Sequence, residues 1–305
     1  MNQQIFKGTG VALVTPLSNG KVDYAALERV INHVLEGGVD YLVSLGTTGE
    51  AVTLSRKECR AVLDFTIKIN NGRLPIVAGH FGHNRTDYLV ERIKEFDFTG
   101  VDAVLSSSPS YIKPSQEGIF QHYMKVEEVC PKPIIIYNVP GRTASNISAE
   151  TTIRLANASP KFIAIKEATG DIVQGSKIIK EAPEDFLVLS GDDPTALALI
   201  ACGGHGVISV IANAFPAQCS SMIRALFNTD YKTAQALNLQ LLDLHQWLYI
   251  DGNPSGIKAA MEILGLCSKE VRLPLVPIQE RNYRNLKIEI EKAIQNKELG
   301  LRIED

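Results

Sequence analysis

Lys166 lies in a segment whose composition predicts a buried strand. The segment Phe162–Thr169 has the sequence Phe-Ile-Ala-Ile-Lys-Glu-Ala-Thr, an apolar run interrupted by a lysine. Desolvation disfavours the ammonium form, so a buried lysine becomes an amine nucleophile for carbonyl carbons. A single lysine at a strand end more often extends its head group into solvent. The choice between these interpretations depends on what lies near Lys166 in the fold.

Other groups suited to the same chemistry follow other apolar segments. Tyr137 ends one segment, Thr47 and Thr48 follow another, and Arg142 lies five residues after Tyr137. Together these residues supply an amine, a phenol, two hydroxyls and a guanidinium. This set suits a keto-acid substrate, because the amine forms an imine with it and the phenol moves protons. The threonine loop would hold one carboxylate, and the guanidinium would bind another. This is class I aldolase chemistry. Taken singly, each residue also fits a structural role as a turn, a core aromatic or a surface charge.

The elements that would position these residues recur along the chain. Eight short runs rich in Val, Ile and Leu are continuous rather than alternating, which is typical of strands covered by helices on both faces. They lie at Gly10–Thr15, Tyr41–Leu45, Leu74–Ala78, Val101–Ser106, Pro133–Asn138, Phe162–Lys166, Phe186–Ser190 and Gly206–Val210.

Amphipathic helices are predicted between the strands. Asp23–Glu36 ends at a Gly-Gly pair, Ser55-x-x-Glu58 is a capping box, and Asp193-Pro194 predicts the N-cap and first residue of a helix over Thr195–Cys202. Eight βα units in series predict an α/β fold, a (β/α)₈ TIM barrel. An open doubly wound sheet is the alternative, but no G-x-G-x-x-G follows the first strand.

A helical extension follows the barrel. Strand patterns cease near residue 225, and helices are predicted at Asp230–Tyr249, Pro254–Leu264 and Ile278–Asn296. We therefore divide the chain into a catalytic barrel, residues 1–224, and a C-terminal helical region, residues 225–305. No low-complexity linker separates them, so we expect the extension to be docked on the barrel.

Composition narrows the class of protein. The 305 residues are 45% hydrophobic and carry a formal net charge of −3, which gives no reason to expect nucleic acid or an anionic membrane as partner. The five cysteines are scattered, and no apolar run is long enough to span a membrane. We expect a cytoplasmic protein with reduced thiols.

The strand ends predict the site, because barrel enzymes place it at the carboxyl rim of the strands. Gly191 follows the seventh strand and Ile208 lies in the eighth. His80-x-x-His83 has a spacing that metal ligands use, but no third ligand is in view, which disfavours a metal-dependent class II aldolase.

These motifs resemble those of the dihydrodipicolinate synthase family, within the pyruvate-dependent superfamily that includes N-acetylneuraminate lyase. The resemblance covers nearly the whole chain, with the motifs in the family's order. They are Val14-Thr15-Pro16, Gly46–Glu50, Pro114–Gly118, Tyr137–Thr143, Ile165–Gly170, Leu189–Asp193 and Gly203–Val210. Thr47-Thr48, the Glu-Ala-Thr-Gly after Lys166 and the presence of Arg142 favour the synthase within the superfamily.

The resemblance implies condensation of pyruvate with L-aspartate 4-semialdehyde to 4-hydroxy-tetrahydrodipicolinate, in lysine and diaminopimelate synthesis. It implies that Lys166 forms the Schiff base and that Tyr137 transfers protons in a relay with Thr47 and Tyr111. The last of these would come from a neighbouring subunit, in a tight homodimer that is commonly doubled to a tetramer. No metal or organic cofactor is implied.

The resemblance also implies the residues that bind the substrates. Thr48 would hold the pyruvate carboxylate, Gly191 and the backbone of Ile208 would line the same pocket, and Arg142 would bind the carboxylate of the semialdehyde.

Two departures from the family pattern stand out. Ser110 precedes Tyr111 where many members have a second tyrosine, which would alter packing between subunits. By approximate alignment, Cys59 and Tyr88 replace a histidine and a glutamate that line the site of lysine inhibition in sensitive members. We therefore expect weak or absent inhibition by lysine.

Two other functions are compatible with parts of this pattern. A sister lyase acting on N-acetylneuraminate or a 2-keto-3-deoxy sugar acid would need hydroxyl partners where Arg142 lies. A barrel that lost catalysis and binds metabolites would be expected to lack one of Lys166, Tyr137, Tyr111 and Thr47, and all four are present.

Overall fold

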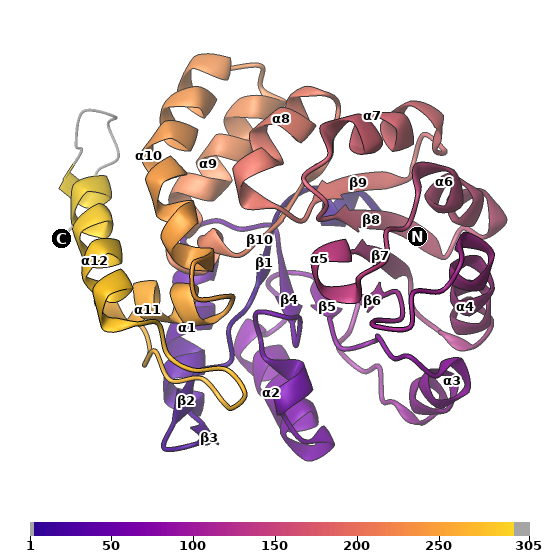
Figure 1. Cartoon of the computed structure of the whole chain (residues 1–305), viewed down its shortest axis with the longest axis horizontal. Helices are drawn as coiled ribbons and strands as arrows, with labels where there is room; N and C mark the ends of the chain where they lie inside the picture. Colours follow the sequence, from indigo (N-terminus) through magenta and orange to yellow (C-terminus); the bar gives the residue numbers. More distant parts are fainter. Residues whose placement is uncertain (1–2, 296–305) are drawn as a thin grey trace.

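The computed structural model describes residues 3–295, in which eight parallel strands close into a barrel surrounded by helices (Figure 1). The barrel strands are β1 (Gly8–Ala12), β4 (Tyr41–Ser44), β5 (Ile76–Ala78), β6 (Ala103–Ser107), β7 (Ile134–Asn138), β8 (Phe162–Glu167), β9 (Leu187–Ser190) and β10 (Gly206–Ser209). Each pairs with its neighbour in sequence, and β10 pairs with β1 to close the ring. The predicted (β/α)₈ barrel is confirmed, and all eight predicted strands are present.

The helices that cover the barrel follow the predicted order. They are α1 (Tyr24–Glu36), α2 (Arg56–Asn70), α3 (Thr86–Glu95), α4 (Gln116–Val129), α5 (Pro140–Thr143), α6 (Ala149–Ala158), α7 (Ile172–Glu181), α8 (Ala196–Ala201) and α9 (Pro216–Phe227). Short 3₁₀ turns lie at η1 (Gln3–Phe6), η2 (Ala51–Thr53), η3 (Asp193–Thr195) and η4 (Ile211–Asn213). A small antiparallel hairpin of β2 (Leu17–Ser18) and β3 (Lys21–Val22) was not predicted.

Local capping was predicted correctly at α2 and wrongly at α8. Ser55 and Glu58 form the predicted capping box at α2, whereas Asp23, expected as the first residue of its helix, caps α1 through the N–H of Ala26. Asp193 does not cap α8. Its buried carboxylate instead accepts hydrogen bonds from the N–H groups of Val210 and Ile211, at 2.8 and 3.0 Å, just after β10. These N–H groups follow a later strand, so the sequence around Asp193 does not reveal them as its hydrogen-bond partners.

The barrel interior and the layer between strands and helices form two separate apolar clusters. At the amino end of the barrel, the ring of Tyr41 fills the interior and meets Phe6 edge-on at 5.5 Å between centroids. Gly10 makes room for this ring, because a Cβ there would lie 2.2 Å from Tyr41. The interior is therefore filled at this end and leaves the carboxyl rim as the place for a site.

Three further helices form the C-terminal extension: α10 (Tyr231–Tyr249), α11 (Ser255–Ile263) and α12 (Glu280–Gln295). Helix α10 packs on α9, and α11 and α12 pack on α10 (Figure 1). The predicted docking is confirmed for the described part. Residues 296–305 of the predicted region lie outside the described residues, and the boundary at residues 224 and 225 stays a prediction. None of the helices within residues 3–295 is long and apolar enough to cross a membrane.

A buried ion pair joins the extension to the loop after β4. Lys258 of α11 is 0% exposed and donates to the Glu50 carboxylate, which is 1% exposed, and to the carbonyl of Glu270. The second carboxylate oxygen accepts the N–H of Arg272 at 3.0 Å. Burial lowers the pKa of Lys258, and the Glu50 carboxylate opposes that shift. The extension therefore holds the end of the segment that carries Thr47 and Thr48.

Removing one partner of this pair should destabilise the protein strongly. We expect Lys258→Met to lower the free energy of unfolding by about 3–5 kcal/mol, because it leaves the Glu50 carboxylate buried without a counterion. The double variant Glu50→Gln/Lys258→Met removes both charges and should recover much of that loss. Urea unfolding measures both; a loss below about 1 kcal/mol in the single variant would contradict this role.

Candidate active site

Lys166 and Tyr137 lie side by side at the carboxyl rim. They occupy paired positions on β8 and β7, and the Lys166 amine lies 4.6 Å from the centroid of the Tyr137 ring. Lys166 is 5% exposed and Tyr137 is 9% exposed, and the tyrosine belongs to the interior cluster. The predicted burial of this lysine, beside a phenol from the neighbouring strand, is observed.

The carboxylate next in sequence points the other way. Successive strand residues face opposite sides, so Glu167 leaves the barrel interior while Lys166 enters it. Glu167 is buried and accepts hydrogen bonds of 2.9 Å from Asn138 and from Gln174 of α7, and one of 2.8 Å from the N–H of Thr169. These bonds fix the ends of β7 and β8 together. Sequence reasoning assigned no role to Glu167, although a glutamate inside an apolar strand indicates that its carboxylate has a structural or chemical role.

Gly191 provides the space that the lysine occupies. It follows β9, and its N–H donates to the carbonyl of Glu167 at 2.7 Å. A Cβ at this position would lie 2.6 Å from the Ala168 side chain and 3.0 Å from Cε of Lys166. Only a glycine lets this backbone approach the lysine so closely.

The loop after β4 brings two hydroxyls to the same rim. Thr47 is half-buried, and Thr48 is buried with its hydroxyl accepting a 3.0 Å hydrogen bond from the side-chain amide of Asn253. The carbonyl of Asn253 in turn accepts a 3.4 Å hydrogen bond from the exposed side chain of Arg142. Asn253 therefore links two predicted binding residues. Sequence reasoning missed it, because its partners lie more than 100 residues away along the chain.

The remaining predicted residues differ in exposure. Ile208 lies in β10 and is 1% exposed, while Tyr111 is 87% exposed in the loop after β6. The backbone of Tyr111 is held by a 3.1 Å hydrogen bond to the carbonyl of Thr143, at a φ of 69°. The neighbouring Ser110 bonds to Asn84. Within one chain, the structure thus directs the Tyr111 side chain toward solvent.

The two histidines of the His80-x-x-His83 pair belong to a cavity beside this rim. Both line its wall, together with Thr47 and Tyr137. Within the described residues, no three His, Cys, Asp or Glu side chains lie together as metal ligands would.

A closed (β/α)₈ barrel that buries a lysine beside a tyrosine at its carboxyl rim has the architecture of class I aldolases, lyases that act through a lysine imine. The chain belongs to the dihydrodipicolinate synthetase family, whose profile matches residues 5–293. The family predicted from the sequence motifs is therefore confirmed.

Individual relatives agree with this assignment. The chain is 50% identical over 278 residues to 4-hydroxy-tetrahydrodipicolinate synthase of Flavobacterium psychrophilum, covering 91% of this chain and 94% of the relative. The structure of that synthase from Methylacidiphilum fumariolicum superposes with a TM-score of 0.93 at 36% identity, over 97% and 98% of the two chains. The chloride-inhibited dihydrodipicolinate synthase of Acinetobacter baumannii, complexed with pyruvate, gives 0.90 at 40% identity, over 94% and 98%.

Filling the space at Gly191 should block the lysine. We expect Gly191→Ala to slow imine formation between Lys166 and a small keto acid by about a hundredfold, because the new methyl group displaces the amine. Borohydride trapping followed by mass spectrometry measures the adduct. Gly141→Ala is the matched control, since a Cβ there meets nothing within 4 Å. Equal trapping in both variants would show that the close approach of Gly191 does not matter.

Proposed function

We propose that this chain condenses pyruvate with L-aspartate 4-semialdehyde to 4-hydroxy-tetrahydrodipicolinate, in lysine and diaminopimelate synthesis. The observation that carries the proposal is the buried amine of Lys166, 4.6 Å from the Tyr137 ring at the carboxyl rim. Family membership and the curated relatives, which are 4-hydroxy-tetrahydrodipicolinate synthases, support the same reaction. The pyruvate complex of the Acinetobacter relative supports the first substrate.

Lys166 starts the reaction by adding to the ketone carbon of pyruvate. Water leaves, and the carbon–nitrogen double bond of the imine forms. Loss of a methyl proton then gives an enamine, whose carbon attacks the aldehyde carbon of the semialdehyde and forms the new carbon–carbon bond. The amino group of the semialdehyde finally displaces Lys166 and closes the ring. Tyr137 is placed to move the protons of these steps, together with Thr47 and Tyr111.

In this proposal, two residues that contact Asn253 bind the two carboxylates of the reaction. Thr48 holds the pyruvate carboxylate, in a pocket that Gly191 and the backbone of Ile208 complete. Arg142 binds the carboxylate of the semialdehyde through its guanidinium. Asn253 contacts both Thr48 and Arg142 and so connects the two groups that would bind the carboxylates. The reaction needs no metal or organic cofactor.

A second copy of the chain supplies Tyr111 in this proposal. A bulky residue at positive φ is a backbone outlier, and such strain is common where a side chain has a function. Exposure of 87% fits a side chain that reaches into a neighbouring site. The protein would act as a tight dimer, doubled to a tetramer. Its five free cysteines suit the reducing cytoplasm.

Replacing the nucleophile should abolish the reaction. We expect Lys166→Ala to lower product formation by more than about a thousandfold, because no imine can form. Coupled oxidation of NADPH by dihydrodipicolinate reductase measures the product. Lys177→Ala, which removes an exposed lysine of α7, is the matched control and should keep full activity.

Product formation and borohydride trapping together test the identity of the acceptor separately from the role of Lys166 as nucleophile. If the wild-type protein forms no product but borohydride traps pyruvate on Lys166, the acceptor is wrong and a sugar-acid substrate replaces the semialdehyde. If no adduct forms on Lys166, the proposed mechanism fails.

Mixing two inactive variants tests the role of Tyr111 across subunits. Tyr111→Phe should lower kcat by about a hundredfold, because the phenol that completes the relay is lost. Unfolding and refolding it together with Lys166→Ala should restore activity above that of either variant alone. A mixed dimer contains one complete site, in which Lys166 of the Tyr111→Phe subunit meets Tyr111 of the Lys166→Ala subunit. Activity that never exceeds the sum of the separate variants would place Tyr111 within its own subunit's site.

A further inference from the structure

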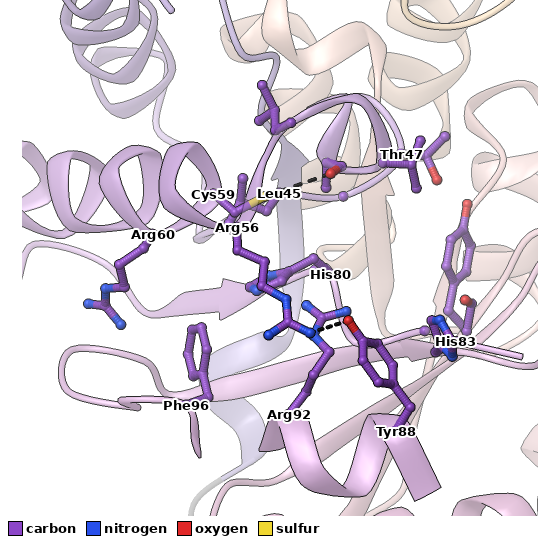
Figure 2. A pocket seen from close by; sticks show the side chains of 18 of the residues that line it. Leu45, Thr47, Arg56, Cys59, Arg60, His80, His83, Tyr88, Arg92 and Phe96 are labelled. Atoms are coloured by element: carbon purple, nitrogen blue, oxygen red, sulfur yellow. Dashed lines mark hydrogen bonds between the residues drawn. The ribbon is translucent and has the colours of Figure 1, made fainter. Parts of the chain in front are cut away.

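A small cavity lies where the C-terminal extension meets the barrel. Its volume is about 10 Å³, and its walls come from α8, α9, α10, β10 and the turns η3 and η4. It is separate from the larger cavity beside the rim, whose wall includes His80 and His83 (Figure 2). A polar cavity of this small size admits one water molecule and no larger ligand.

Three polar side chains line the small cavity. Asn238 and His245 lie two turns apart on the same face of α10, and Asp193 borders the cavity from η3. His245 is 7% exposed and Asp193 is 4% exposed. Apart from the thiol of Cys219, the other side chains of the wall are apolar. Cavities that stay dry are lined by apolar groups, so this wall favours a bound water.

The imidazole of His245 needs a partner. Its Nδ1 atom is buried and has no hydrogen-bond partner in the described part of the chain. Burial lowers the pKa of His245, although the carboxylates of Asp193 and Asp192 oppose that shift, so the ring is neutral at pH 7. A neutral imidazole donates or accepts one hydrogen bond at this nitrogen. Because a buried polar atom without a partner costs free energy, such atoms usually contact a protein group or an ordered water.

The thiol on the wall already has a partner. Cys219 donates to the hydroxyl of Ser209 at 3.7 Å. Burial and the nearby Asp193 carboxylate raise the pKa of Cys219, so the thiol keeps its proton. A thiol has one proton to donate, and Ser209 accepts it. The carboxylate of Asp193 is therefore the group on this wall best suited to a hydrogen bond from a water molecule.

Asp193 connects the cavity to the catalytic rim. Its Oδ2 atom accepts hydrogen bonds from the N–H groups of Val210 and Ile211, which directly follow β10. Ile208, whose backbone lines the proposed pyruvate pocket, lies two residues before Val210 in the chain. Gly191, which makes room for Lys166, lies two residues before Asp193. A shift of Asp193 would therefore move backbone on two sides of that pocket.

We propose that the cavity binds one water molecule, through which His245 positions Asp193 and thereby the backbone of Ile208. The water accepts a hydrogen bond from Nδ1–H of His245 and donates one to the Asp193 carboxylate, and the amide of Asn238 supplies a third contact. His245 touches no substrate and is a positioning residue. Its effect on pyruvate rests on the proposed function, whereas the water site itself does not.

Hydrogen exchange at the amides of Val210 and Ile211 tests the water bridge without any substrate. Mass spectrometry of the peptides that contain them measures the rates. We expect His245→Leu to raise both rates by about tenfold, because Asp193 loses a contact that holds it against these N–H groups. His245→Asn should stay close to the wild-type rates, since its amide places a polar atom near the position of Nδ1.

His122→Leu is the matched control. It also removes a buried imidazole with an unpartnered nitrogen, but from α4, far along the chain from this cavity. Exchange at Val210 and Ile211 should not change in this variant. Equal acceleration in His122→Leu and His245→Leu would show general loosening of the protein and would overturn the proposal, as would equal acceleration in His245→Asn.

Steady-state kinetics test the effect on the pocket. In His245→Leu the KM for pyruvate should rise by about tenfold, while kcat and the KM for the semialdehyde change by less than about twofold. The reason is that Ile208 lines the pyruvate pocket, whereas Arg142 lies on α5. His245→Asn should restore the KM for pyruvate. A fall in kcat with both KM values unchanged would indicate a loss of folded protein and would exclude the positioning role.

A crystal structure of the wild-type protein tests the site without any variant. Density for one water within hydrogen-bond distance of His245 and Asp193 supports the proposal, and a dry cavity overturns it. Unchanged exchange in His245→Leu also overturns it. If the wild-type protein forms no product but exchange responds as expected, the proposed reaction fails and the water bridge stands.

Discussion

The register between β7 and β8 is the constraint on which the site depends. It pairs Tyr137 with Lys166, and the alternation of strand residues turns both side chains toward the barrel interior. The same alternation sends Glu167 outward, where Asn138 and Gln174 satisfy it. Slipping this strand by one residue would exchange an amine for a carboxylate at the centre of the site. The hydrogen bonds of Glu167 therefore hold the strand ends together. They also keep Lys166, rather than Glu167, facing the barrel interior.

The C-terminal extension provides the second support for the rim. Its buried Lys258 anchors Glu50, and its Asn253 contacts both Thr48 and Arg142. A (β/α)₈ barrel builds its site from loops, and loops are the parts that move most easily. Docked helices that bond to two of these loops restrict that movement. The extension thus acts on the geometry of the site although it contributes no proposed nucleophile or proton donor.

Charge is distributed differently on the two sides of the wall that carries Thr47 and Tyr137. On the side of Lys166, the nearby carboxylate of Glu167 is turned away and bound by neutral or backbone donors. On the other side, Arg56 and Arg92 are close together without a bound carboxylate. The first arrangement keeps a negative partner away from an amine that must react. The second creates a positive potential beside α2 and α3.

The sequence alone determined the eight βα units, the position of Lys166 at a strand end and the family, because strand and helix patterns are local and the family motifs are short segments in fixed order. It placed Asp193 wrongly, as a helix cap, because that carboxylate binds backbone groups from a later strand. Only the tertiary structure paired Glu50 with Lys258 and brought Arg56 beside Arg92. These contacts join separate elements, and the free energy of such contacts depends on burial and distance, which no local pattern encodes.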